Sequence, residues 1–249
     1  MMNPAEFANI AKAENNFWWY RGMRRIMFGL LDPVARQRKF GRVLEAGCGT
    51  GHFARALAHR YHWPMFPLDL GWEGLEYGKG LGINHLSQGD IQSLPYRDAA
   101  FDAVISMDVI VHMPLGDEHK PMREFHRVLP PGGFLALRAS ALDILRSHHS
   151  QFAMERQRFT RRRLIQLAET TGFKVLRCTY ANSLLLPVAL LKFRLLEPLL
   201  GRQPESGVQP VPPWLDTLLY APLKAESKLL PAGVNLPLGQ SLILLAERR

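Results

Sequence analysis

Three glycines at every second position follow a short apolar run near the start of the chain. The segment is residues 43–51 (VLEAGCGTG), and an amphipathic helical pattern begins directly after it. A glycine lets the backbone approach a ligand, because a Cβ at Gly47, Gly49 or Gly51 would occupy that space. Strand, glycine turn and helix are the opening of a nucleotide-binding βαβ unit. The segment therefore predicts a nucleotide-like ligand at the end of a strand.

The glycine spacing and one carboxylate narrow the choice of ligand. G-x-G-x-G differs from the G-x-G-x-x-G of dinucleotide-binding proteins, and no G-K-[ST] for a triphosphate follows it. The carboxylate of Glu45, beside the loop, would repel a pyrophosphate but suits a ligand that carries an ammonium group. These features favour S-adenosylmethionine; the alternative is an ordinary glycine turn without a ligand.

Two aspartates extend the predicted ligand site. Asp69 ends a second apolar run, 22 residues after Gly47, which is close to the interval of about 20 at which an acidic residue meets a bound ribose. Asp90 and the next backbone N–H, that of Ile91, offer an acceptor and a donor to an adenine edge. Each aspartate also has the simpler interpretation of a turn former.

A few side chains are candidates for removing a proton from an oxygen or acidic carbon acceptor. A histidine with a pKa near neutrality suits this role. His112 leads because it follows the predicted strand 101–107, while His148, His149 and Tyr20 belong to segments positioned to cover a cleft. A structural or substrate-orienting role is the alternative for each of them.

The elements that must position these residues alternate between strand and helix patterns. Residues 5–38 form two predicted helical segments around the aromatic and basic cluster at residues 17–21, which is interpreted as core packing, as a lid, or as both. The remaining predicted strands are 65–68, 101–107, 134–139, 173–180 and 241–247, with helices at 72–80, around 122–128 and from residue 160.

Composition limits the class of protein. With 249 residues, 47% of them hydrophobic, the chain can bury the core of one α/β domain with additions. The net charge of +9 allows an acidic partner, an anionic substrate or an anionic lipid surface. Cys48 and Cys178 show neither disulfide pairing nor metal-ligand spacing, so we expect no metal site and a reducing, cytoplasmic location. We find neither a signal sequence nor a transmembrane segment.

Several motifs in order resemble one family over residues 40–140. The chain is similar to class I S-adenosylmethionine-dependent methyltransferases of the small-molecule, type 11-like branch. The resemblance rests on residues 44–51, 68–70, 89–96, 101–112 and 129–133, and residues 18–22 resemble an aromatic and basic segment of one subgroup. Two departures are Gly71, where the family commonly has Ser, and Val111, where many members carry Glu.

The resemblance assigns roles to the motif residues. Glu45 and the glycine loop would face the methionine part of S-adenosylmethionine, Asp69 the ribose, and Asp90 with Ile91 the adenine. Met107 and Asp108 would lie near the sulfonium and the acceptor. The complete set of expected cofactor-binding residues is Glu45, Gly47, Cys48, Gly49, Gly51, Asp69, Leu70, Asp90, Ile91, Met107 and Arg21.

The family fold is a Rossmann-like, doubly wound sheet of seven strands, the last one antiparallel. Mapped on this chain, it predicts an N-terminal helical lid at 1–39, a core at 40–180, an insertion at 181–240 and a closing strand at 241–249. The insertion begins with a leucine-rich helical pattern, and seven prolines after it are expected to divide the rest into short pieces. It is interpreted as a subdomain packed on the core or on a second subunit, a cap over the acceptor, or a helix on a membrane surface, since Lys192 and Arg194 interrupt the leucines.

These observations predict an enzyme that methylates oxygen or carbon of a small organic acceptor, with apolar, lipid-linked and anionic acceptors all compatible. One alternative is an RNA methyltransferase, although residues 106–109 lack the Asn/Asp-Pro-Pro-aromatic motif of the N-methylating nucleic-acid enzymes of this fold, and we expect no nucleic-acid partner. Another is a catalytically silent S-adenosylmethionine-binding protein. We expect a monomer or a homodimer, with peripheral membrane contact left open.

Overall fold

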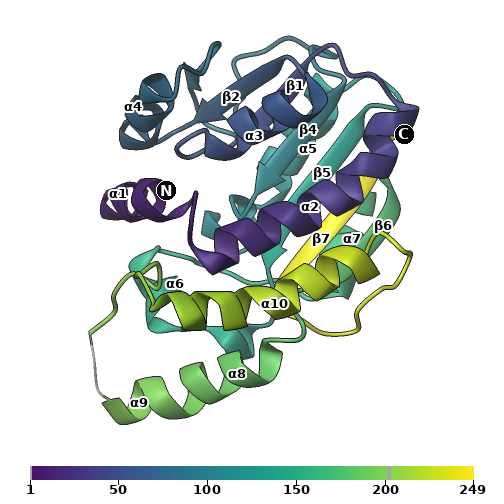
Figure 1. The fold of residues 1–249 in the computed structure, drawn as a ribbon. Helices are drawn as coiled ribbons and strands as arrows, with labels where there is room; N and C mark the ends of the chain where they lie inside the picture. Colours follow the sequence, from purple (N-terminus) through teal and green to yellow (C-terminus); the bar gives the residue numbers. More distant parts are fainter. Residues whose placement is uncertain (1, 201–202) are drawn as a thin grey trace.

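A seven-stranded sheet forms the centre of the protein (Figure 1). The computed structural model describes residues 2–200 and 203–249; residue 1 of the predicted lid and residues 201–202 of the predicted insertion lie outside this part. The strand order is β3-β2-β1-β4-β5-β7-β6, and β7 is antiparallel to both of its neighbours. This confirms the Rossmann-like, doubly wound sheet with an antiparallel last strand. The strands are β1 (Val43–Ala46), β2 (Met65–Asp69), β3 (Ser87–Gln88), β4 (Ala103–Met107), β5 (Phe134–Ser140), β6 (Phe173–Ala181) and β7 (Ser241–Arg248).

Helices connect the strands and extend the chain at its start and before β7. The predicted helices near 5–38, 72–80, 122–128 and 160 are confirmed with small shifts of their ends. The helices are α1 (Pro4–Ala13), α2 (Trp18–Gln37), α3 (His52–Tyr61), α4 (Trp72–Gly80), η1 (Ile110–His112), α5 (His119–Val128), η2 (Asp143–Leu145), α6 (His148–Phe152), α7 (Arg161–Thr170), α8 (Leu186–Leu191), η3 (Lys192–Leu196), α9 (Glu197–Leu200) and α10 (Pro213–Leu229).

Alternate residues of the central strands serve two separate cores. Leu44 and Val104 pack with apolar side chains of α5 and α7 on one face of the sheet. Val43 and Ile105 pack with side chains of α2, α3 and α10 on the other. Successive strand residues point to opposite faces, so each strand contributes to both layers. Because both faces are covered, the polar loops at the strand ends are left to form a site.

The predicted strand 101–107 begins two residues later than expected. The carboxylate of Asp102 accepts hydrogen bonds from the backbone N–H groups of Gly41 and Arg42, at 2.6 and 2.9 Å. Asp102 therefore connects the segment before β4 to the segment before β1 and does not itself belong to the strand.

The prediction that prolines divide residues 204–240 into short pieces is wrong. α10 runs through 17 residues with Pro222 inside it. Pro213 begins the helix at a position where a backbone N–H has no intrahelical partner. Leu223 is fully buried, and a Cβ at Gly22 of α2 would lie 2.3 Å from its Cδ1, so the two helices approach closely. This apolar packing offsets the hydrogen bond lost at Pro222.

One buried carboxylate anchors the start of the insertion to α10. Glu226 accepts hydrogen bonds from the backbone N–H groups of Asn182, Ser183 and Leu184, at 2.6, 2.6 and 2.7 Å. These bonds hold the chain where it leaves β6. The short helices α8, η3 and α9 continue from this point, at the lower end of the molecule in Figure 1.

Candidate cofactor and acceptor site

The glycine loop lies beside the point where the sheet order reverses, between β1 and β4. Gly47, Gly49 and Gly51 have φ values of 79, 56 and 73°, a region that glycine adopts without strain. The N–H of Gly47 donates to the Leu68 carbonyl at 2.8 Å. A Cβ at Gly47 would also lie 2.2 Å from a methyl group of Val109, just after β4. The loop therefore requires glycine for its conformation and, at Gly47, for its packing.

Backbone N–H groups of two loops hold the carboxylate of Asp69 in place. Its two carboxylate oxygens accept hydrogen bonds from the N–H groups of Gly49 (2.7 Å) and Gly71 (2.8 Å). Burial raises the pKa of Asp69, and these two bonds oppose the shift. Each carboxylate oxygen accepts more than one hydrogen bond, so both retain capacity for a pair of hydroxyl groups. This geometry suits the predicted contact with a ribose.

The departure at Gly71 has a structural reason. A Cβ at this position would lie 2.6 Å from the ring of Phe7. Phe7 is buried and belongs to α1. The same ring would lie 2.7 Å from a Cβ at Gly74, near the start of α4. α1 thus covers the loops after β1 and β2, where Phe7 takes the space that a serine would need.

Asp90 lies beside Asp69 at the edge of the sheet. The N–H of Gly89 donates to the Asp69 carbonyl at 3.0 Å, and Asp90 Oδ1 accepts from the N–H of Gln92 at 2.9 Å. This is an Asx turn, which agrees with the simpler interpretation of Asp90 as a turn former. Ile91 is buried and Leu70 is exposed. Adenine recognition by Asp90 and Ile91 stays a prediction.

Glu45 and Cys48 are buried in the wall behind the loop. Within residues 2–200 and 203–249, Glu45 Oε2 has no hydrogen-bond partner. Burial raises the pKa of Glu45, opposed by the N–H of Ala54 in α3. Burial and then the Glu45 charge also raise the pKa of the Cys48 thiol, so it does not act as a nucleophile. An unpartnered buried acceptor is costly, and a cationic or hydrogen-bond-donating ligand would satisfy it.

Glu14 belongs to the same region and was missed by the sequence reasoning. Thr50, within the glycine loop, donates its hydroxyl hydrogen to Glu14 Oε2 at 2.5 Å. Burial raises the pKa of Glu14 to about 7, opposed by the Thr50 hydrogen bond and by the charge of Arg24. No motif marks Glu14, because it follows α1 and reaches the loop only through the fold.

The acceptor end of the site is built from β4, β5 and α2. Asp108, at a φ of 57°, pairs with Arg138 of β5. The Arg138 guanidinium lies 4.7 Å from the centre of the Trp19 ring, which meets Tyr20 edge-on at 5.0 Å. Asp108 Oδ1 and Arg138 Nε are buried without a partner among the residues that the structure describes. Met107, at the end of β4, is half-buried against the core that contains α2.

Tyr20 is enclosed by charged groups. Burial raises its pKa far above the ordinary value, and the neighbouring carboxylate of Glu6 adds to the shift, while Arg138 opposes it. The phenol therefore keeps its proton at neutral pH. Tyr20 suits hydrogen-bond donation to an acceptor group rather than proton removal.

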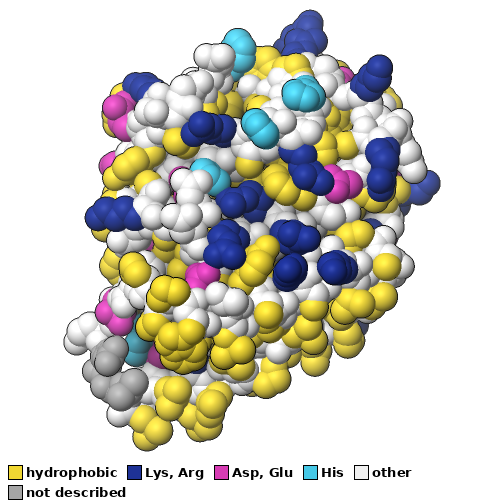
Figure 2. Space-filling model, in the orientation of Figure 1, with side chains coloured by type: hydrophobic (Ala, Val, Ile, Leu, Met, Phe, Trp, Pro, Cys, Tyr) yellow, Lys and Arg dark blue, Asp and Glu magenta, His cyan; other side chains and the backbone are white. Residues whose placement is uncertain are grey.

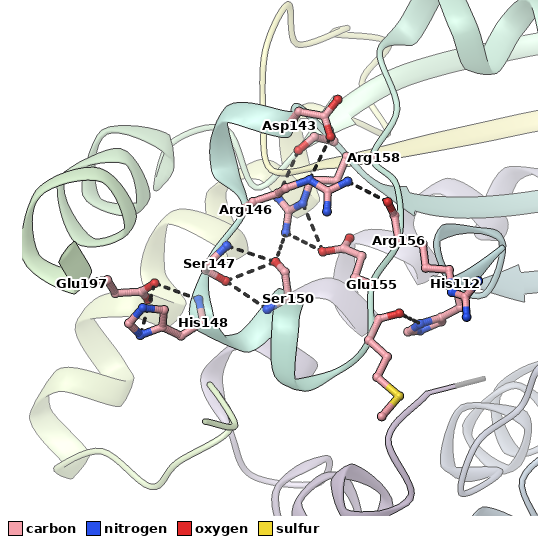
Figure 3. Close-up of polar contacts among 12 residues, drawn as sticks. His112, Asp143, Arg146, Ser147, His148, Ser150, Glu155, Arg156, Arg158 and Glu197 are labelled. Carbon is pink, nitrogen blue, oxygen red and sulfur yellow. Dashed lines mark hydrogen bonds and ion pairs between the residues drawn. The ribbon is translucent and has the colours of Figure 1, made fainter. Parts of the chain in front are cut away.

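His112 has the geometry of a neutral imidazole, and its Nε2 has no hydrogen-bond partner among the residues that the structure describes. Its Nδ1 lies 3.2 Å from the Met154 carbonyl oxygen (Figure 3). A carbonyl only accepts hydrogen bonds, so we assign the proton to Nδ1 and the lone pair to Nε2. Burial lowers the pKa of His112, and a charge on it would act on Asp69 and on Asp108. The predicted base thus lies within the field of both predicted site carboxylates.

The other predicted residues have contacts elsewhere. The backbone N–H of His148 donates to Glu197 of α9 at 2.9 Å, and Figure 3 shows this pair on the opposite side of the 143–158 segment from His112. His149 Nδ1 accepts from the N–H of Gly207 at 3.0 Å. Arg21 pairs with Asp216 at 2.7 Å, on α10. Catalysis by His148 or His149 and cofactor binding by Arg21 stay predictions without support from these contacts.

Arg24, one turn after Arg21, is the arginine that contacts the neighbourhood of the glycine loop. Its Nη1 donates to the Glu14 carbonyl at 3.0 Å and lies 3.4 Å from Nδ1 of His52, the residue after the loop. Arg24 is therefore a second candidate for the cation that the sequence assigned to Arg21.

Comparison with solved structures defines the class of fold. A putative sarcosine dimethylglycine methyltransferase from Galdieria sulphuraria aligns with 90% of this chain and 85% of its own, at a TM-score of 0.59 and 19% identity. At this identity the likeness concerns the fold alone. It confirms the methyltransferase type of Rossmann-like sheet.

Sequence comparison gives the family. Residues 44–137 match the model of a methyltransferase domain. A glycine/sarcosine/dimethylglycine N-methyltransferase of Actinopolyspora halophila is 37% identical over 37% of this chain and 17% of its own. A malonyl-[acyl-carrier protein] O-methyltransferase of Erwinia billingiae is 30% identical over 54% of this chain and 53% of its own. Residues 44–137 are therefore a methyltransferase domain of the class I S-adenosylmethionine-dependent type, which implies S-adenosylmethionine as the cofactor.

The domain match covers the segment that contains most of the predicted cofactor-binding residues. The chain spans from about one sixth to about half of the length of the curated relatives reported above. The domain match ends at residue 137, before the 143–158 segment and the insertion. No helix among the described residues is long and apolar enough to cross a membrane.

Proposed function

We propose that this protein transfers the methyl group of S-adenosylmethionine to an oxygen or acidic carbon of a small organic acceptor, with His112 as the general base. The observation that carries the proposal is the His112 hydrogen bond to the Met154 carbonyl, which leaves Nε2 free to take a proton. The Erwinia billingiae relative, whose name states an O-methyltransferase, supports an oxygen acceptor.

The cofactor half fits the group that the family implies. Asp69 would accept from the ribose hydroxyls, and the unpartnered Glu45 oxygen would receive the ammonium group or a water that binds it. S-adenosylmethionine supplies an activated methyl group on a good leaving group, so positioning contributes much of the acceleration. Because Phe7 lies against Gly71 and Gly74, beside Asp69, we expect α1 to shift when the cofactor binds.

The acceptor half supplies orientation. Tyr20 would donate a hydrogen bond to the acceptor, while Arg138 remains paired with Asp108 and stacked on Trp19. His112 would remove the proton that the acceptor loses as the new bond to the methyl carbon forms. Because burial lowers the pKa of His112, the free base persists at pH 7 and is lost only when the pH falls below the ordinary histidine range.

Labelled S-adenosylmethionine tests the reaction class. The protein is incubated with separate small-molecule, RNA and protein pools, and label is expected in the small-molecule pool alone. Label in RNA alone would favour an RNA methyltransferase, and cofactor binding without transfer to any pool would favour a silent binding protein. Either result overturns the proposal.

A matched pair of variants tests the base. His112→Asn is expected to lower kcat by about 10²–10⁴-fold with little change in cofactor affinity, which is the range for loss of a general base. His119→Asn, which alters a histidine at the start of α5, is the control. Equal activity of both variants would remove His112 from the base role and leave positioning as the only catalytic contribution.

A further inference from the structure

A stripe of exposed apolar side chains runs along the helical segment at the start of the insertion. Its members recur at intervals of three or four residues, which places them on one face of a helix. Two of them, Leu195 and Leu199, are 55% and 81% exposed. We call this set the leucine stripe: Leu184, Val188, Leu191, Leu195 and Leu199.

α10 adds two large apolar side chains to the same end of the molecule. Trp214 is 68% exposed, and Leu218 lies one turn further along the helix and is also exposed. Figure 2 shows hydrophobic side chains gathered along the lower end of this face, over α8, α9 and α10. Single exposed leucines are ordinary on soluble proteins, whereas a continuous apolar band marks a surface that another body covers.

Basic side chains flank the leucine stripe. Lys192 and Arg194 interrupt it, and within the described ranges neither forms an ion pair with a carboxylate. On the same face, Figure 2 shows Lys and Arg side chains above the apolar band, over α2 and α10. Arg24, Arg25 and Arg60 line a surface cavity of about 450 Å³ in this region, where Arg60 pairs with Asp32 and Arg25 donates a hydrogen bond to the hydroxyl of Ser227. The surface therefore combines apolar contact area with excess positive charge.

The charge distribution selects the occupant. In a symmetric dimer built on the leucine stripe, Lys192 and Arg194 of both copies would lie within one interface, because a two-fold interface is formed by the same patch of each copy. Like charges brought together oppose such an association. An anionic bilayer satisfies both parts of the surface, since apolar side chains enter the acyl boundary while basic side chains remain at the phosphates.

We propose that α8, η3, α9 and the start of α10 form a docking surface for an anionic membrane. The leucine stripe with Trp214 enters the interface, and Lys192, Arg194 and Arg25 contact lipid phosphates. This proposal is independent of the proposed function, because membrane binding requires neither S-adenosylmethionine nor an acceptor.

Vesicle co-sedimentation of the full chain tests the docking surface. We expect binding to vesicles that contain phosphatidylglycerol, and at least about tenfold weaker binding to pure phosphatidylcholine and at high salt. The double variant Leu191→Glu/Leu195→Glu is expected to reduce binding by at least about tenfold. Leu176→Glu, a leucine of β6 that is 46% exposed and outside the stripe, is the matched control and should bind as the original chain does.

Two further measurements keep the result decisive. Circular dichroism and S-adenosylmethionine affinity must be unchanged in the double variant, and Lys192→Glu/Arg194→Glu must weaken binding to the anionic vesicles selectively. No binding to anionic vesicles, equal binding by the double variant, or a dimer in sedimentation velocity that the double variant abolishes would each overturn the proposal.

Discussion

The cofactor half and the acceptor half of the site use different kinds of contact. In the cofactor half, Asp69 is held by backbone N–H groups of Gly49 and Gly71, in loops that follow neighbouring strands. In the acceptor half, Asp108 is held by the side chain of Arg138, which stacks in turn on Trp19 from α2. Asp69 thus depends on the backbone conformation of two loops, and Asp108 depends on side chains from distant segments.

This difference predicts that substitutions in one half of the site change ligand affinity, while substitutions in the other half change stability. Backbone donors remain in place when a side chain in the cofactor half is changed, so substitution there should affect ligand affinity more than stability. A buried ion pair leaves an uncompensated charge when one partner is removed. Substitution in the acceptor half should therefore affect stability first.

The largest expected effect is that of Arg138→Met. This change leaves Asp108 charged and partly buried, and it should reduce the free energy of unfolding by about 3–5 kcal/mol. Urea denaturation measures the loss. Lys120→Met, which breaks the exposed pair with Asp117, is the control and should cost no more than about 1 kcal/mol. Similar losses in both variants would contradict the distinction between the halves.

Asp69→Ala should act on affinity instead. Loss of the acceptor for the ribose hydroxyls is expected to weaken S-adenosylmethionine binding by about 2–3 kcal/mol, or roughly 30- to 150-fold. Isothermal titration calorimetry gives the affinity, with Asp143→Ala, at an exposed carboxylate, as the control. Unchanged affinity in Asp69→Ala would remove this residue from the site.

Glu14 links the cofactor loop to pH. Its pKa is raised to about 7 in the folded protein, so the native state binds more protons than the unfolded state between about pH 4.5 and 7. Protonated Glu14 therefore adds to the free energy of unfolding at low pH, and this contribution is lost as the pH rises through about 7. The expected loss is roughly 1–2 kcal/mol, after allowance for the incomplete burial of Glu14. Thermal denaturation of Glu14→Gln should lack this slope, and an identical slope in both proteins would show that another group produces it.

The smallest expected effect concerns α1. Phe7→Ala removes the ring that packs against Gly71 and Gly74, and it should lower the cost of moving α1 away from the cofactor loops. We expect S-adenosylmethionine to associate a few-fold faster in stopped-flow fluorescence, since a larger fraction of the protein is competent to bind. The association rate of Phe7→Leu should lie between those of the original chain and Phe7→Ala. Slower association in Phe7→Ala than in the original chain would contradict this prediction and mean that α1 helps to recruit the cofactor.

Prediction from sequence succeeded where function depends on contiguous segments. Residues 43–51 join a strand, a glycine turn and a helix, and every one of these features appears as expected. Prediction failed at α10, because the packing of Leu223 against Gly22 is a tertiary contact that allows Pro222 inside the helix. Glu14 was missed for the same reason, since only the fold places it at Thr50.

By itself the sequence determined the sheet, the methyltransferase domain and its expected cofactor, because the glycine loop and the strand-end aspartates are local patterns with fixed backbone consequences. The tertiary structure decided which side chains surround the proposed acceptor position. Tyr20, Arg138 and the segment that contains Asp108 and His112 are far apart in the sequence. The pKa shifts of Tyr20 and His112 and the pairing of Asp108 with Arg138 arise from burial in the fold, which no single segment encodes. The exposure of the leucine stripe was likewise decided by the tertiary structure, because the leucine-rich pattern alone also fits a helix packed on the core.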